Sequence, residues 1–252
     1  KGRKLLSSLL SLSGLTNREQ AQINLLQGTI LRQSGEYASS VESLQEALIC
    51  FASLGDRQGQ ADALRSLALS YGDRGDLVAA QASIGRSIAI AKDCGDVRRE
   101  ALGRKDQGYL LSQVGRPEEA IPILESAGRT LRLLNDLPHA SQVMSSLGLI
   151  AFRRNQPYLA GKHYKVALRL GESAGMANRL GMTWMNLGLC FLLQGQPEPA
   201  EKSFRKAEKR LKRMGSYRAL ALLYANLGML RLSQNDHVAA GRYTELSESL
   251  CQ

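Results

Sequence analysis

The side chains that could carry out chemistry are few in this chain and lie far apart in the sequence. Its three histidines, His139, His163 and His237, fall in three different stretches, so a metal site or a catalytic triad has little to build on. The carboxylates Glu118 and Glu119 stand where a helix is expected to begin, and negative charge there suits the helix dipole. Motifs that bind nucleotide phosphates, hold a catalytic zinc ion or form a nucleophile elbow are absent from the sequence. We therefore expect no enzyme, with no catalytic, cofactor-binding or metal-binding residues.

The four cysteines are also poorly placed for chemistry. Cys50, Cys94, Cys190 and Cys251 form no C-x-x-C pair and lie near no histidine cluster. A secreted disulfide scaffold would be shorter and richer in cysteine. No stretch of the sequence approaches the ~18 apolar residues of a membrane span. We expect free thiols, a reducing compartment, a cytoplasmic location and no membrane partner.

The composition favours helices. The chain has 252 residues, of which 44% are hydrophobic, and it can therefore bury a substantial core. Leucine and alanine, both good helix formers, supply most of the apolar content, whereas aromatic residues make up only 5%. Runs of valine, isoleucine and threonine that would indicate a sandwich or a barrel are scarce. We predict an all-α fold.

Small residues recur every 40 residues in four columns. The first column is Gly28, Ala68, Gly108, Gly148, Gly188 and Gly228, and the second is Gly35, Gly75, Gly115, Asn155, Gly195 and Asn235. The third is Ser40, Ala80, Ala120, Ala160, Ala200 and Ala240, and the fourth is Ala47, Ser87, Ala127, Ala167, Ala207 and Ser247. A larger side chain stands between the last two columns in most repeats, at Leu44, Ile84, Leu124, Tyr164 and Phe204, with Thr244 as the exception. Four columns in register over six units indicate an internal repeat.

Each repeat is expected to be a helical hairpin. Small residues in the first, third and fourth columns let two helices approach closely, because larger side chains would hold their backbones apart. The glycine or asparagine of the second column is the turn, since these residues tolerate the left-handed conformation that ends a helix. A second loop closes each unit, at Gly55, Gly95, Asn135, Gly175 and Gly215. At the start of the first helix, Thr16 and Glu19 have the spacing of a capping box.

This pattern resembles the tetratricopeptide (TPR) repeat. The fifth repeat matches the family signature most fully, at Asn186, Leu187, Gly188, Gly195, Ala200, Phe204 and Ala207. The long period is similar to that of the TPR variants in sensor domains of MalT-type bacterial transcription activators and in LGN-type scaffold proteins. The resemblance implies a right-handed superhelical solenoid of about six hairpins, at about 15–54, 55–94, 95–134, 135–174, 175–214 and 215–252. Residues 1–14 would end a preceding repeat, so that the single solenoid of residues 1–252 is an excerpt of a longer protein.

In the TPR family the first helices of successive hairpins line a concave groove that binds ligands. Carried onto this sequence, the earlier repeats contribute polar groove residues, namely Gln22, Arg32, Asp62, Arg65, Asp73, Lys105, Asp106, Tyr109, Gln142 and Arg153. The last two repeats contribute Met182, Met185, Leu189, Leu192, Leu193, Leu222, Met229 and Leu232, with Asn186 and Asn226 among them. An amide supplies the donor and the acceptor that a peptide backbone requires. Because Met182, Met185 and Leu189 occupy the regions of the family's carboxylate clamp, we do not expect a chaperone-tail clamp.

The net charge of +10 is concentrated in one part of the sequence. Residues 151–218 contain 14 basic and four acidic residues, whereas the rest of the chain is neutral. The densest part of this basic patch is Lys202, Arg205, Lys206, Lys209, Arg210, Lys212 and Arg213. Such a patch is consistent with a solvated helix face, with an acidic protein partner or with nucleic acid. No aromatic ladder accompanies it, which weakens the case for binding single strands.

The sequence therefore favours recognition rather than catalysis. We expect a protein- or peptide-binding TPR module, the sensor or scaffold region of a larger cytoplasmic regulatory or signalling protein, with a peptide segment in its concave groove. Arg65, Lys105, Tyr109 and Arg153 would orient the peptide, and the apolar groove residues would provide affinity. Two alternatives remain: self-association or intramolecular docking through uncapped end repeats, and nucleic-acid binding through the basic surface of 151–218.

Overall fold

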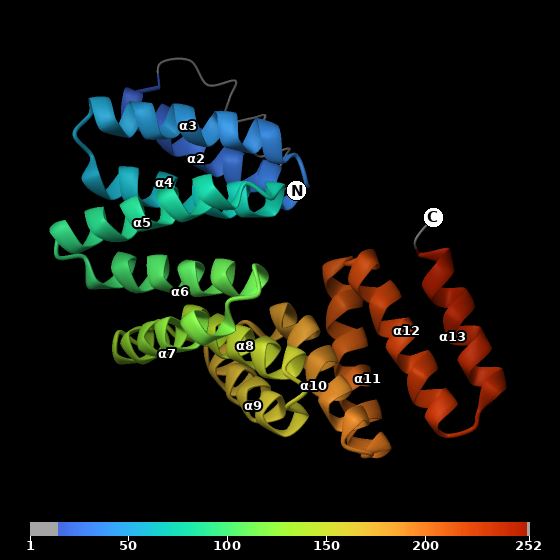
Figure 1. Ribbon diagram of the computed structural model, residues 1–252. Helices are drawn as coiled ribbons and strands as arrows, with labels where there is room; N and C mark the ends of the chain where they lie inside the picture. Colours follow the sequence, from blue (N-terminus) through green and yellow to red (C-terminus); the bar gives the residue numbers. More distant parts are fainter. Residues whose placement is uncertain (1–14, 251–252) are drawn as a thin grey trace. The chain divides into compact units, whose positions relative to one another are not determined.

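The all-α prediction is confirmed by a computed structural model, which describes residues 15–250 (Figure 1). Within that range the chain forms helices and connecting turns, without strands. The helices are α2 (Asn17–Gln33), α3 (Tyr37–Ser53), α4 (Arg57–Arg74), α5 (Leu77–Asp93), α6 (Val97–Gln113), α7 (Pro117–Leu133), α8 (Leu137–Arg153), α9 (Pro157–Ser173), the 3-10 helix η1 (Ala177–Leu180), α10 (Gly181–Leu193), α11 (Pro197–Met214), α12 (Tyr217–Ser233) and α13 (His237–Ser249). None of these helices is long and apolar enough to cross a membrane. The end of a preceding repeat, which we expected at residues 1–14, lies outside the described residues, as does Cys251.

The described helices pack into two compact units, one up to residue 130 (unit 1) and one from residue 131 onward (unit 2). In unit 1, α2 pairs with α3 and α4 with α5, while α3 packs on α4 and α5 on α6. In unit 2 the pairs are α8 with α9, α10 with α11 and α12 with α13. First helices of consecutive hairpins also touch, because α4 contacts α2 and α6, and α10 contacts α8 and α12. Each unit therefore places its first helices side by side, which gives their outward-facing side chains a common surface.

Left-handed residues end the helices, as the sequence predicted. The turns within hairpins have positive φ at Gly35, Gly75, Gly115, Asn155, Gly195 and Asn235. The loops between hairpins have positive φ at Gly55, Gly95, Asn135, Gly175 and Gly215. At the asparagines φ is between 54° and 60°, a conformation that most other side chains adopt only with strain. Both columns of turn residues are confirmed.

The starts of the helices are fixed by side-chain caps. Thr16 and Glu19 form the expected capping box, with the Thr16 hydroxyl accepting from the Glu19 amide at 3.3 Å and Glu19 accepting from the Thr16 amide at 2.9 Å. Five later helices begin with an aspartate whose carboxylate accepts a backbone N–H three residues on, at Asp56, Asp76, Asp96, Asp136 and Asp236. These carboxylates satisfy amide donors that have no partner inside the helix and face the positive end of its dipole.

The small-residue columns allow each hairpin to close. A Cβ atom added to Gly148 of α8 would lie 2.7 Å from the Cε1 atom of Tyr164 on α9. The equivalent atom on Gly188 would lie 2.5 Å from Phe204 on α11. Both aromatic side chains are fully buried. In these two hairpins the first-column residue is therefore small because the larger residue of the partner helix occupies the space that a side chain would need.

Candidate functional site

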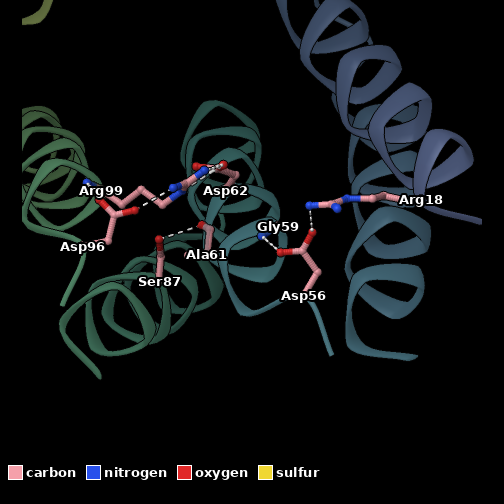
Figure 2. A network of polar contacts seen from close by, with 8 residues as sticks. All are labelled: Arg18, Asp56, Gly59, Ala61, Asp62, Ser87, Asp96 and Arg99. Atoms are coloured by element: carbon pink, nitrogen blue, oxygen red, sulfur yellow. Dashed lines mark hydrogen bonds and ion pairs between the residues drawn. The ribbon is translucent and has the colours of Figure 1, made fainter. Parts of the chain in front are cut away.

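The first helices of unit 1 are joined by ion pairs between consecutive hairpins. Arg32 of α2 contacts Asp73 of α4, with 2.7 Å between Nη1 and Oδ2. Arg99 of α6 reaches Asp62 of α4 at 3.1 Å and also its own helix cap, Asp96, at 2.6 Å (Figure 2). Three residues that we expected in a ligand groove, Arg32, Asp62 and Asp73, thus connect neighbouring hairpins.

A more deeply buried ion pair links α4 to α6. The Asp106 side chain is only 3% exposed; one carboxylate oxygen lies 2.9 Å from Arg65 Nη1, and Lys105 contacts the other. Burial alone would raise the pKa of Asp106, but the two cations outweigh it and hold that pKa below its usual range. Asp106 thus forms ion pairs with Arg65 and Lys105, two residues that we expected to orient a peptide. Tyr109 is half-buried and Arg153 is exposed. A role of these four residues in orienting a peptide stays a prediction.

The first helices of unit 2 carry an exposed apolar row, which we define as Met182, Leu189 and Leu193 of α10 with Leu222 and Met229 of α12. Met182 and Leu193 are 42% and 58% exposed, and Leu222 and Met229 are 52% and 47% exposed. Leu189 is half-buried. Spacings of seven and eleven residues place the members of each helix on one face. Since α10 contacts α12, and Met182 and Leu189 are equivalent to Leu222 and Met229 one repeat later, the row forms one surface.

Two asparagines lie within the apolar row. Asn186 of α10 and Asn226 of α12 are half-buried and occupy equivalent positions. Burial raises the pKa of the Tyr164 hydroxyl, and the Asn186 side chain beside it acts in the opposite direction. Leu192, also predicted in the groove, is half-buried and packs against the core of the last two hairpins. The row thus combines exposed apolar side chains with two amides.

Met185 is not a groove residue, contrary to our expectation. It is 4% exposed and belongs to the hydrophobic core that α10, α11 and α12 build around Phe204 and Leu223. At about 100° per residue, Met185 lies about 40° from Leu189 on one side and Leu193 about 40° on the other, so that Met185 is about 80° from Leu193 around the helix. A charged substitution at Met185 would therefore disrupt the core and would report on stability rather than on binding.

The basic patch lies on α11, and four of its cations form a stripe along one face. Lys202, Lys206, Lys209 and Arg213 follow one another at spacings of four, three and four residues, and all four are exposed. We call these four residues the basic stripe. Among the described residues none of them has a carboxylate within ion-pair distance. The other cations of the patch are paired, Arg205 with Glu201, Arg210 with Glu172 and Lys212 with Glu208.

A cavity of about 430 Å³ lies beside the basic stripe. It is lined by Lys165, Leu168, Arg169 and Glu172 of α9 and by Trp184, Leu187 and Phe191 of α10. Lys206 Nζ lies 4.2 Å from the centroid of the Trp184 ring, and Lys165 Nζ lies 5.1 Å from that of Phe191. We call this site the Trp184 cavity. We did not predict this cavity from the sequence, although a signal exists: in each cation–aromatic pair the two residues are about half a repeat apart in the sequence.

Potential metal ligands do not cluster in the described part of the chain. Between residues 15 and 250 no three His, Cys, Asp or Glu side chains gather in a way that could hold a metal ion. Cys50, Cys94 and Cys190 are free thiols, as expected. Burial raises the pKa of Cys190 to about 12, so this thiol is a poor nucleophile at neutral pH.

Comparison with known proteins supports the repeat assignment. Residues 183–210 match the tetratricopeptide repeat family. No curated protein matches the chain significantly. The finer similarity to MalT-type activators and LGN-type scaffolds stays a prediction.

Solved structures with the same fold are distant in sequence. A Rap protein in complex with competence and sporulation factor is 16% identical, with a TM-score of 0.80 over 98% of this chain and 69% of that one. The Rap conjugation gene regulator of plasmid pLS20, in complex with the Phr* peptide, is 16% identical, with a TM-score of 0.73 over 99% and 67%. A signal transduction ATPase of Pyrococcus horikoshii with a tetratricopeptide repeat sensor is 15% identical, with a TM-score of 0.78; the match covers 98% of this chain but 38% of that one.

Proposed function

We propose that this tetratricopeptide-repeat chain is a non-catalytic module that binds a peptide segment of a partner protein on the apolar row of unit 2. The observation that carries the proposal is the exposure of Met182, Leu193, Leu222 and Met229 on adjacent first helices. A soluble domain seldom exposes neighbouring large apolar side chains in such number without a partner to cover them. Two of the solved structures of the same fold are complexes, one of them with a peptide.

The energetics favour a ligand with both apolar and polar groups. Covering the exposed parts of these four side chains would remove roughly 300 Å² of apolar surface, worth about 7 kcal/mol before the costs of association. Polar contacts must add to this for useful affinity, and in this proposal the half-buried amides of Asn186 and Asn226 would supply them to a peptide backbone. The methionines let the surface adapt to ligands of different shape.

The context that the sequence favours, a sensor or scaffold region of a larger cytoplasmic regulator, is part of this proposal. Self-association and intramolecular docking, the alternatives from the sequence, stay predictions.

The experiment is a selection of peptides from a random display library against the chain, followed by fluorescence anisotropy with the enriched sequences. The test variant is Leu222→Glu/Met229→Glu, in which both changed side chains are exposed and the fold is expected to survive. The matched control is Val238→Glu/Leu246→Glu, which adds the same charge at exposed apolar positions of α13. We expect binding at least about tenfold weaker in the test variant, because glutamate buries poorly against apolar groups. If none of the enriched peptides binds the test variant more weakly than it binds the control variant, the proposal is wrong.

A further inference from the structure

The apolar row and the Trp184 cavity lie on opposite faces of α10. Successive residues of a helix are rotated by about 100°, which puts Met182, Leu189 and Leu193 on one side and the cavity residues Trp184 and Phe191 on the other. The cavity is instead continuous with the basic stripe on α11, because Lys206 of that stripe stacks on the Trp184 ring. Unit 2 therefore presents a second surface, independent of the one in the proposed function.

We propose that this second surface binds an acidic peptide segment whose carboxylates face the basic stripe while one apolar side chain enters the Trp184 cavity. Leu168, Leu187 and Phe191 give the cavity an apolar lining, and its volume of about 430 Å³ exceeds that of a leucine or phenylalanine side chain. Lys165 and Arg169 stand at its α9 side and are exposed. An apolar pocket with cations around it selects a peptide that is both acidic and apolar.

The charge of the surface fits such a partner. Residues 151–218 carry the entire net charge of the chain, +10, and the stripe residues face solvent without carboxylate partners among the described residues. From Lys202 to Arg213 the stripe spans eleven residues, or roughly 16 Å of helix. An extended peptide covers that length with about five residues. Unneutralised cations this close together repel one another, and an acidic ligand relieves that repulsion.

The aromatic side chains argue against nucleic acid as the ligand. Binding of single strands relies on open aromatic faces on which bases stack. Here Lys206 and Arg210 lie over the Trp184 ring, at 4.2 and 5.6 Å from its centroid, and Lys165 lies over Phe191. These faces are already occupied by cations of the chain. What remains open is the cavity, which accepts an aliphatic or aromatic side chain rather than a stacked row of bases.

The proposal can be tested with three synthetic peptides of about ten residues, labelled with fluorescein. The first is rich in glutamate and aspartate with one central leucine, the second replaces the acids by their amides, and the third replaces the leucine by alanine. Trp184 is the only tryptophan of the chain, so its emission reports directly on the cavity. We expect the first peptide to shift that emission and to bind at least about tenfold more tightly than the second and several-fold more tightly than the third. Equal affinity of the three peptides would overturn the proposal.

Variants locate the binding surface by peptide anisotropy. Lys206→Glu/Lys209→Glu reverses two charges of the stripe and should weaken the acidic peptide at least about tenfold. The control Arg218→Glu/Arg242→Glu makes the same change in charge at exposed positions of α12 and α13, and it should have less than a threefold effect. Equal losses in the two variants would show attraction to net charge alone and refute the site.

Two further comparisons separate this site from the alternatives. The variant Leu222→Glu/Met229→Glu should bind the acidic peptide normally, even if the apolar row proves to have no ligand. Loss of the acidic peptide in that variant would place it on the other face and overturn the inference. A single-stranded oligonucleotide is the second comparison. If it binds more tightly than the acidic peptide, and if the logarithm of its binding constant falls linearly with the logarithm of the salt concentration, the basic stripe binds nucleic acid instead.

Discussion

Asp106 holds together the first helices α4 and α6, and Asp106→Asn should destabilise unit 1 strongly. The substitution keeps the shape of the side chain but removes its charge. Arg65 and Lys105 would then remain close together and mostly buried, with side chains only 24% and 13% exposed, and without the carboxylate that neutralises them. The loss therefore combines a broken ion pair with repulsion between two cations.

The size of the effect follows from the geometry. At 2.9 Å and an effective dielectric constant of about 20, the Arg65–Asp106 pair alone is worth about 6 kcal/mol of Coulomb energy. Part of this offsets the desolvation of the buried carboxylate, so the net loss is smaller. Removing one partner of a buried pair costs about 3–5 kcal/mol. We expect about 3 kcal/mol, because Arg65 keeps some contact with water.

Urea unfolding of the full chain, followed by circular dichroism, measures this loss. With a slope of about 3 kcal/mol per molar urea, the midpoint should fall by about 1 M. The matched control is Asp73→Asn, which breaks the Arg32–Asp73 pair. The side chains of that pair are 25% and 28% exposed. That change should cost less than about 1 kcal/mol. If the two variants lose equal stability, the argument from burial is wrong.

The same carboxylate predicts a pH dependence. Because the pKa of Asp106 is lower in the folded state than in the unfolded chain, its contribution is fully present above the unfolded pKa of about 4. It is lost as the pH falls through the folded pKa. The difference in unfolding free energy between wild type and Asp106→Asn should therefore be constant near neutral pH and shrink below about pH 4. A difference that grows on acidification would contradict this sign.

Three other predictions concern packing, capping and reactivity. In urea unfolding, Gly188→Ala should cost about 2 kcal/mol of stability because its Cβ would meet a buried phenylalanine. Gly241→Ala has open space around the new Cβ and should stabilise α13 by about 0.5 kcal/mol. Equal effects of the two substitutions would refute the close-packing argument. Thr16→Ala should cost about 1 kcal/mol through loss of the capping box, and no change would show that this helix start does not depend on it. Iodoacetamide at pH 8 should label exposed Cys94 long before buried Cys190 in the folded chain, and comparable rates, followed by mass spectrometry, would contradict the burial of Cys190.

The repeat architecture was predictable because local rules determine it. A glycine or asparagine with positive φ, such as Asn155 or Gly195, can end a helix without help from distant residues. The close approach of Gly188 to Phe204 joins residues of one hairpin, and the 40-residue period exposes the pattern six times over. Hydrophobic spacing and turn chemistry therefore agree on the same fold.

The surfaces were less predictable because they depend on which side of each helix faces the next hairpin. Met185 and Leu189 are four residues apart and equally apolar, yet the first is core and the second borders the surface. From its position in the repeat we expected Arg65 to be a cation of the ligand groove, but the buried Asp106 on the following hairpin neutralises it. The Trp184 cavity combines side chains of α9 and α10 with a cation from α11, a combination that no single helix shows.

The way in which the hairpins of unit 1 contact one another has a mechanical consequence. In its described part, α2 to α6 touch only helices of their own or a neighbouring hairpin, and ion pairs such as Arg32–Asp73 join one hairpin to the next. A force applied to the two ends of such an arrangement passes through every junction in series. Under tension in an optical trap, each junction should rupture separately and release one hairpin of 40 residues, or about 130 Å of contour length. Unit 1 would then lengthen in discrete steps under load, with the Arg65–Asp106 junction among the last to yield.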